Sequence, residues 1–113
     1  MEKINHYRTI IKEVMAYIGS LGIKPGDPVQ SQLIEDDRNG HYLVFTNGWR
    51  GELRHYGCRL HIDLAPDGKV WLQHDGTDLV VADMLIEKGI PTSDIVLGFY
   101  PPIVRPETGF AVS

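Results

Sequence analysis

The sequence predicts an α+β fold: an N-terminal helix on an antiparallel β-meander, then a second helix, a further strand and an extended C-terminal tail. Apolar residues recur every three or four positions in residues 2–20, as on one face of a helix. Four strand-like runs follow between residues 29 and 74, separated by turn segments. Because the strands are grouped rather than alternating with helices, the order favours α+β over a parallel βαβ arrangement.

The composition indicates one globular domain, residues 1–113. Hydrophobic residues make up 42% and charged residues 23%, which is ordinary for a domain of this length. Eleven Lys and Arg against fifteen Asp and Glu give a net charge of −4, which argues against a protein whose main task is to grip a phosphate backbone. The single cysteine cannot form an internal disulfide. With no signal peptide or membrane-spanning run in the sequence, we expect a cytoplasmic protein.

Residues 2–20 have the pattern of an amphipathic helix that lies on a sheet. The apolar positions are Ile4, Tyr7, Ile11, Val14, Ile18 and Leu21, flanked by Ile10, Met15 and Tyr17. This face is wider than the seam of a coiled coil. Gly19 and Gly22 end the helix, and the Pro-Gly-Asp-Pro segment at residues 25–28 forms a turn.

The four strand-like runs cover about residues 29–36, 41–49, 53–64 and 69–74. Asn39-Gly40 and Asp67-Gly68 supply residues that accept the backbone angles of tight turns. Alternation is clearest in the third run, where successive side chains point to opposite faces. It predicts one face with Tyr56, Cys58, Leu60, Ile62 and Leu64, and the other with His55, Arg59, His61 and Asp63.

The fourth run specifies the register of the meander. On the core face, Val70 is expected beside Ile62, and Leu72 beside Leu60. Trp71 and Gln73 then join the polar face. A slip of one residue would bury the polar set, so the hydrophobic pattern determines the pairing and places Trp71 outside the core.

A second helix is expected after residues 75–77, with Asp75 or Thr77 as its N-cap. It should run to about Lys88, because Gly89-Ile90-Pro91 is typical of a left-handed cap followed by a helix breaker. Residues 95–99 predict a buried strand. The prolines from residue 101 onward favour an extended, poorly paired tail.

Two side chains of the third run suggest chemistry without completing a site. His61 and Asp63 share a face as two metal ligands could, but a zinc site needs three or four. Arg59 and Lys69 nearby would repel a cation, so we expect a hydrogen-bonded polar face with no metal, no cofactor and no catalytic residue. Cys58, on the predicted apolar face, should pack as a small hydrophobic residue.

Two surfaces are candidates for binding a macromolecule. Arg50, Arg54 and Arg59, interleaved with aromatic residues, form a basic cluster of the kind that binds single-stranded nucleic acid. Trp71 among polar neighbours suggests a protein-binding surface instead, because Trp and Arg are enriched at interface hot spots. We expect protein binding and keep direct nucleic-acid binding as the alternative.

A series of short stretches appears in a characteristic order in the second half of the chain. The stretches are Tyr56-Gly57-Cys58, Leu60-His61-Ile62-Asp63, Gly68-Lys69-Val70-Trp71-Leu72-Gln73, Asp75-Gly76-Thr77, Gly89-Ile90-Pro91 and Asp94-Ile95-Val96-Leu97-Gly98-Phe99. The ends are Asn5-His6-Tyr7-Arg8 and Phe110-Ala111-Val112-Ser113. In these stretches the chain resembles the XisI family over nearly its whole length. It departs from the family pattern mainly in residues 40–54 and at His74.

The resemblance implies a non-catalytic factor that controls site-specific excision of a DNA element, as XisI does for the fdxN element of cyanobacteria. It also implies a companion protein of the XisH type and no catalytic residue. The residues expected to bind this partner are Arg59, His61, Trp71 and Gln73, with the tail residues Arg105 and Phe110. The wide apolar face of the first helix, Trp71 on the polar face and the apolar, Pro-rich tail together predict self-association, as a dimer.

Overall fold

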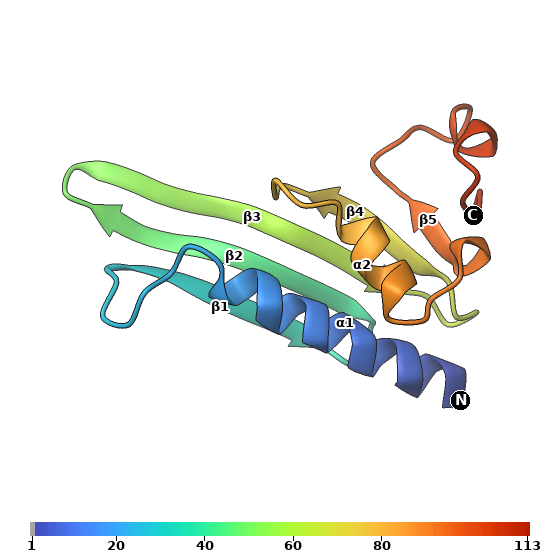
Figure 1. Ribbon diagram of the computed structural model, residues 1–113, viewed down its shortest axis with the longest axis horizontal. Helices are drawn as coiled ribbons and strands as arrows, with labels where there is room; N and C mark the ends of the chain where they lie inside the picture. The colour runs from blue at the N-terminus through green and yellow to red at the C-terminus, as the bar shows by residue number, and fades with distance from the viewer. Residues whose placement is uncertain (1) are drawn as a thin grey trace.

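Five strands form one sheet, and both α-helices lie on the same face of it (Figure 1). The computed structural model describes residues 2–113. The elements are α1 (Glu2–Ser20), β1 (Val29–Asp36), β2 (His41–Arg50), β3 (Leu53–Leu64), β4 (Val70–Asp75), α2 (Val81–Glu87), η1 (Thr92–Asp94), β5 (Ile95–Leu97) and η2 (Arg105–Glu107). The strands pair in chain order, antiparallel from β1 to β4, and β5 runs parallel to β4. The predicted α+β meander is confirmed, and its last strand makes the sheet mixed.

Helix α1 has the bounds that its apolar periodicity predicts. Its buried side chains recur every three or four residues and comprise Tyr7, Ile10, Ile11, Val14, Met15 and Ile18. Gly19 lets the end of the helix approach β1, since a Cβ there would lie 2.8 Å from Cδ1 of Leu33. The helix therefore lies against the sheet over the whole length of the helix. The β2–β3 hairpin extends beyond the end of the helix (Figure 1).

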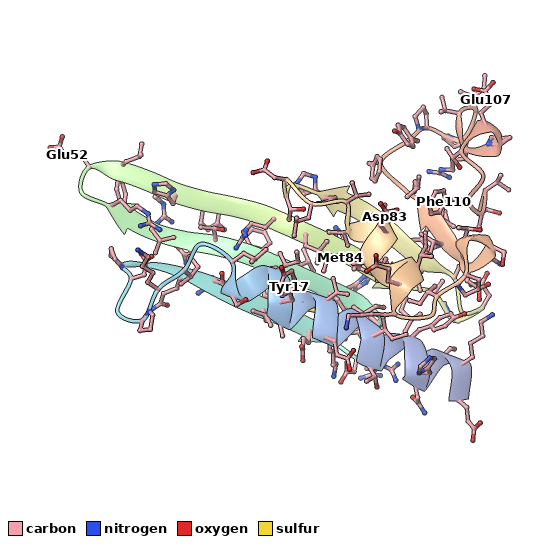
Figure 2. All side chains as sticks on the ribbon, in the orientation of Figure 1. Tyr17, Glu52, Asp83, Met84, Glu107 and Phe110 are labelled. Carbon is pink, nitrogen blue, oxygen red and sulfur yellow. The ribbon has the colours of Figure 1, made fainter. Side chains whose placement is uncertain are left out.

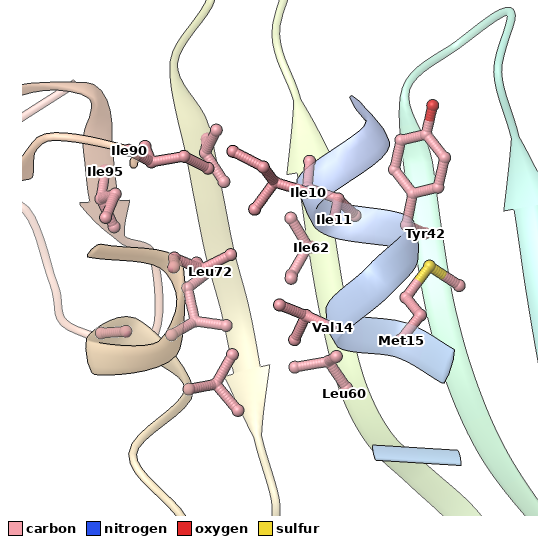
Figure 3. Packing of buried hydrophobic residues seen from close by; sticks show 14 of the residues in the cluster. Ile10, Ile11, Val14, Met15, Tyr42, Leu60, Ile62, Leu72, Ile90 and Ile95 are labelled. Atoms are coloured by element: carbon pink, nitrogen blue, oxygen red, sulfur yellow. The ribbon is translucent and has the colours of Figure 1, made fainter. Parts of the chain in front are cut away.

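The core lies between the two helices and the sheet (Figure 3). The four strand residues predicted to share the core face, Leu60, Ile62, Val70 and Leu72, are each at most 1% exposed. Fully burying such a side chain contributes about 1.5–3 kcal/mol. A one-residue slip of β4 would forfeit that burial, and the predicted core face is confirmed. The pairing itself differs from the prediction, because Val70 pairs with Leu64 and Leu72 with Ile62.

Helix α2 begins later than predicted, at Val81 rather than directly after residues 75–77. Asp75 still serves the first turn from the end of β4, because its Oδ2 accepts a hydrogen bond from the Val81 amide at 2.9 Å. Its Oδ1 accepts one from the Thr77 amide and so holds the intervening loop. The helix ends as predicted: Gly89 has φ of +115°, and the amide of the buried Ile90 donates to the Leu85 carbonyl.

Neither α1 nor α2, the α-helices of residues 2–113, combines the length and the apolar character that crossing a lipid bilayer requires.

The prolines predicted an extended C-terminal tail, but the tail is not extended throughout. Strand β5 stops at Leu97, and residues 101–107 form turns and the short helix η2. The chain then returns to the sheet, where the Ala111 amide donates to the Ile95 carbonyl at 2.9 Å and Ala111 pairs in parallel with Val96. The Ala111 amide therefore has its hydrogen-bond partners within the chain, beside β5.

Tyr7 and Asp94 connect α1 to the segment before β5. The Tyr7 hydroxyl donates to Oδ2 of Asp94 at 2.5 Å, and Nζ of Lys3 lies 3.0 Å from the same oxygen. Burial raises the pKa of Asp94, but the bonds from Tyr7 and Lys3 outweigh it and hold the pKa below its ordinary value of 3.8. Burial, with the bond to Asp94, also raises the pKa of Tyr7 to about 12.

We predict that Tyr7→Phe lowers the free energy of unfolding by about 1–2 kcal/mol at neutral pH, because a hydrogen bond to a carboxylate is lost. Since folding depresses the pKa of Asp94, its stabilisation is complete well above 3.8 and is lost as the pH falls below 3.8 through the lower pKa of the folded state. The effect of Tyr7→Phe should therefore shrink on acidification. Urea unfolding at neutral pH and at about pH 3 measures it. Tyr17→Phe, at an exposed tyrosine of α1, is the control, and an effect that does not change with pH would contradict the prediction.

Candidate functional site

The sheet face that points away from α1 and α2 carries most of the predicted site residues. We call it the open face; it includes Ile34, His41, Phe45, Trp49, Arg54, Tyr56, Cys58, His61, Asp63, Trp71 and Gln73. These assignments follow from the pairing, because cross-strand partners point the same way and alternate with the buried residues. Of the described residues, those of α1 and α2 all lie on the other side of the sheet (Figure 1).

A β-bulge at Arg59 interrupts the alternation of β3. Val44 pairs with Leu60 and Phe45 with Cys58, so Arg59 is an extra residue on β3. Its guanidinium donates to the Leu21 carbonyl beyond the end of α1 at 3.2 Å. Arg59 therefore points to the helix side.

The bulge corrects two predictions from the strand pattern. Arg59 does not share a face with His61, because the extra residue turns it toward α1. Cys58 and Tyr56 do not share the core face of Leu60, since they pair with residues of β2 that point outward. Cys58 is half-buried on the open face, and burial raises the pKa of its thiol. A protonated thiol is a poor nucleophile, and Cys58 lies outside the core cluster in which it was predicted to pack.

Two histidines converge on one carboxylate oxygen at the β2–β3 pair. Nδ1 of His41 lies 2.8 Å and Nε2 of His61 lies 2.9 Å from Oδ1 of Asp63, while Nε2 of Gln73 donates to Oδ2 at 3.2 Å. The bond to Asp63 raises the pKa of His41. Burial raises the pKa of Asp63. The hydrogen bonds from the two histidines and Gln73 have a larger effect in the opposite direction, so the pKa lies below its ordinary value.

His41 is the residue of this cluster that the sequence did not indicate. It is the cross-strand partner of Asp63 only because the bulge shifts the register by one residue. His61 and Gln73 were predicted to share this face with Trp71, and the structure brings them together around Asp63. His41 is the first residue of β2, so its place at that end of the strand is visible in the sequence, whereas its pairing with Asp63 is not.

Trp71 lies on the open face beside this cluster, and the tail contacts it. The guanidinium carbon of Arg105 lies 5.1 Å from the Trp71 ring centroid, and its Nε donates to the Tyr100 carbonyl. Arg105 rather than Arg59 is therefore the arginine next to Trp71. Phe110 is half-buried against the core, so it holds the tail in place.

The three arginines of the predicted basic cluster do not form one patch. Arg54 stacks between two rings of the open face, 5.3 Å from Trp49 and 4.9 Å from Tyr56. Arg50 donates to Asp27 at 3.1 Å, and Arg59 contacts the end of α1. Arg54 is thus the one member that the described structure places on the open face.

The two ends of the open face are far apart. Figure 2 shows Glu52 at the tip of the β2–β3 hairpin and Glu107, in η2, at the opposite end of the molecule. The stacked Trp49, Arg54 and Tyr56 belong to the hairpin end, and Trp71 with Arg105 belongs to the other. A partner of modest size could therefore contact one end without the other.

Comparison with known proteins identifies the family of the chain. The family model described as "XisI protein" matches residues 1–112. The chain belongs to the XisI family. A search of curated proteins finds no match.

Solved structures of XisI proteins have the same fold. One is a XisI-like protein from Anabaena variabilis ATCC 29413, with 34% identity, a TM-score of 0.85, and coverage of 98% of this chain and 99% of that one. Another is the fdxN element excision controlling factor XisI from the same organism, with 35% identity, a TM-score of 0.82 and the same coverage. The predicted resemblance and the XisI-like fold are confirmed.

We predict that Arg59→Ala lowers the free energy of unfolding by about 1 kcal/mol, because a cation beyond the C-terminal end of α1 is lost together with its hydrogen bond. Arg54→Ala, which removes an exposed stacked arginine of the same strand, should change it by less than about 0.5 kcal/mol. Urea unfolding of both variants measures the difference. Equal effects would mean that the contact with Leu21 adds nothing beyond surface stacking.

Proposed function

We propose that the chain is a non-catalytic accessory factor that controls site-specific excision of a DNA element by binding a protein of the XisH type. The observation that carries this proposal is the match to an excision controlling factor XisI at 35% identity over nearly the full length of both chains. The companion protein is the one that the family resemblance implies.

The partner surface in this proposal is the end of the open face at Trp71. Trp71 and Arg105 stack there, with His61 and Gln73 beside them. Trp and Arg are the residue types most enriched in hot spots, and a stacked pair is already ordered before binding. The tail contributes Arg105 but not main-chain pairing, since Ala111 is already bonded beside β5. Arg59 and Phe110 are left out, because they contact α1 and the core.

Direct nucleic-acid binding through Arg50, Arg54 and Arg59 is the weaker alternative. Arg50 is paired with Asp27, Arg59 faces α1, and the net charge of the chain is −4. A single arginine between two aromatic rings offers little phosphate neutralisation. Retention of the chain on single-stranded DNA that weakens with salt and is lost in Arg54→Ala would favour this alternative.

We predict that Trp71→Ala weakens the complex with the XisH-type protein about 30-fold or more, the effect of losing a hot-spot side chain of about 2 kcal/mol. The fold should persist, because Trp71 lies outside the core cluster. Co-purification and calorimetric titration with the partner measure the loss, and circular dichroism checks folding.

Trp49→Ala is the matched control, since Trp49 is on the same face at the hairpin end and is 53% exposed. It should leave binding unchanged. Loss of binding in Trp49→Ala alone would move the interface to the hairpin. Wild-type chain that does not bind the partner at all would refute the proposal.

We also propose that the chain self-associates as a dimer through the apolar part of the open face. Ile34, Trp49 and Tyr56 are 46%, 53% and 64% exposed there, and small domains commonly bury such surfaces by pairing. Light scattering at high micromolar concentration should give twice the monomer mass, and Tyr56→Lys should reduce it. A monomer mass for the wild-type chain would contradict this part of the proposal.

A further inference from the structure

We propose that His41, His61 and Asp63 bind one divalent transition-metal ion, with zinc as the ion that fits them best. Two imidazole nitrogens and one carboxylate oxygen are donors that zinc accepts, and three protein ligands leave a position for water. The inference is independent of the proposed function, because it concerns the isolated chain.

The ligand atoms are already gathered. The three atoms lie within 4.8 Å of one another, and Oδ1 of Asp63 is 2.8 Å from Nδ1 of His41 and 2.9 Å from Nε2 of His61. Ligands of a tetrahedral zinc ion are roughly 3.3 Å apart, given bond lengths near 2.0–2.1 Å. The two oxygen–nitrogen distances would grow by about half an ångström, and the spacing of the two nitrogens, which lie within 4.8 Å of each other, would change by up to about 1.5 Å, both within the range of side-chain movement.

Paired strands and a close backbone contact hold the part of the chain that carries the cluster. His41 and Asp63 are paired residues of β2 and β3, and the Leu64 amide donates to the Gly40 carbonyl at 2.8 Å. Gly40 has φ of +76°, and a Cβ there would lie 2.2 Å from the Leu64 carbonyl oxygen. Only glycine allows this close approach, which sets the distance between the ligands on the two strands.

Gln73 supplies the outer contact that metal-binding carboxylates commonly have. It donates to Oδ2 of Asp63 and leaves Oδ1 directed at the histidines. Gly98 leaves room for it, since a Cβ there would lie 2.4 Å from Oε1 of Gln73. Such contacts orient a ligand and raise metal affinity. A cavity of about 340 Å³, lined by His41, Asp63, Trp71 and Gln73, gives an ion and its water access to the cluster.

The surrounding charge no longer argues against a cation. Arg59, which the strand alternation placed beside His61, points to α1 instead. Lys69, the other cation expected to repel an ion, acts electrostatically on Asp94, the partner of Tyr7 and Lys3 in α1. Asp36 acts electrostatically on His41 and adds negative potential. Arg105 is held by the Trp71 ring and the Tyr100 carbonyl rather than by Asp63.

Binding of an ion would displace the protons that now lie between the histidines and Asp63, and each neutral imidazole would then carry its proton on its other ring nitrogen. Each imidazole coordinates through the nitrogen that faces Oδ1, and the carboxylate exchanges two hydrogen bonds for one metal bond. No residue outside the cluster has to move.

The experiment is titration of the untagged full chain with zinc chloride by calorimetry, and with cobalt chloride followed by visible absorption. We expect about one ion per chain. His41→Ala, His61→Ala and Asp63→Asn should each weaken binding by at least ~10-fold, since even outer-shell substitutions have effects of this size. Gln73→Ala should give a smaller loss in the same direction.

His6→Ala is the control, because His6 is an exposed histidine on α1 and lies outside the cluster. It should leave binding unchanged. Since His41 is 52% exposed, His41→Ala tests the site even where Asp63→Asn fails to fold. The proposal is overturned if the wild-type chain binds no zinc, or if His6→Ala weakens binding as much as His41→Ala does.

Discussion

The bulge at Arg59 is the constraint on which the arrangement of the open face depends. An unbroken ladder from the hairpin tip would place Ile62 opposite His41, on the open face, and would turn Asp63 toward the core. The extra residue shifts the pairing so that His41 meets Asp63 outside the core while Ile62 stays inside. Arg59 itself then points to α1, and its carbonyl accepts a hydrogen bond from Gly76 after β4. Arg59 thus bonds both to the segment after α1 and to the segment after β4. The shift in pairing that it causes also keeps the polar cluster outside the core.

Sequence reasoning succeeded where buried positions recur at a regular spacing over many residues. The apolar period of α1 and the alternation of β3 and β4 predicted bounds within about one residue, and Trp71 lies outside the core as its neighbours Val70 and Leu72 required. A slip in any of these elements would move a whole apolar set into water. The loss of burial would be so large that the local hydrophobic pattern alone excludes such a slip.

The parts that sequence reasoning missed depend on single residues and long-range contacts. A bulge changes the alternation at one position, so nothing in the local composition of residues 57–60 marks it. Asp75 was identified as a cap, but it reaches the Val81 amide across a loop, and the helix therefore begins later than the cap suggested. The tail was read as extended from its prolines, whereas Ala111 pairs beside β5 through contacts distant in the chain.

Asp63 shows why the open face is more than a solvated surface. Its side chain is 24% exposed, and its hydrogen bonds come from two histidines and a glutamine rather than from Lys or Arg. A partly desolvated carboxylate without a permanent cation adds little to stability, since neutral donors only partly replace water. The core of α1, α2 and the sheet does not need it, because the cluster lies on the opposite face. Two strands and a glutamine hold the Asp63 carboxylate beside two histidines. This arrangement points to a ligand that carries positive charge, which the carboxylate and the two imidazoles can contact together.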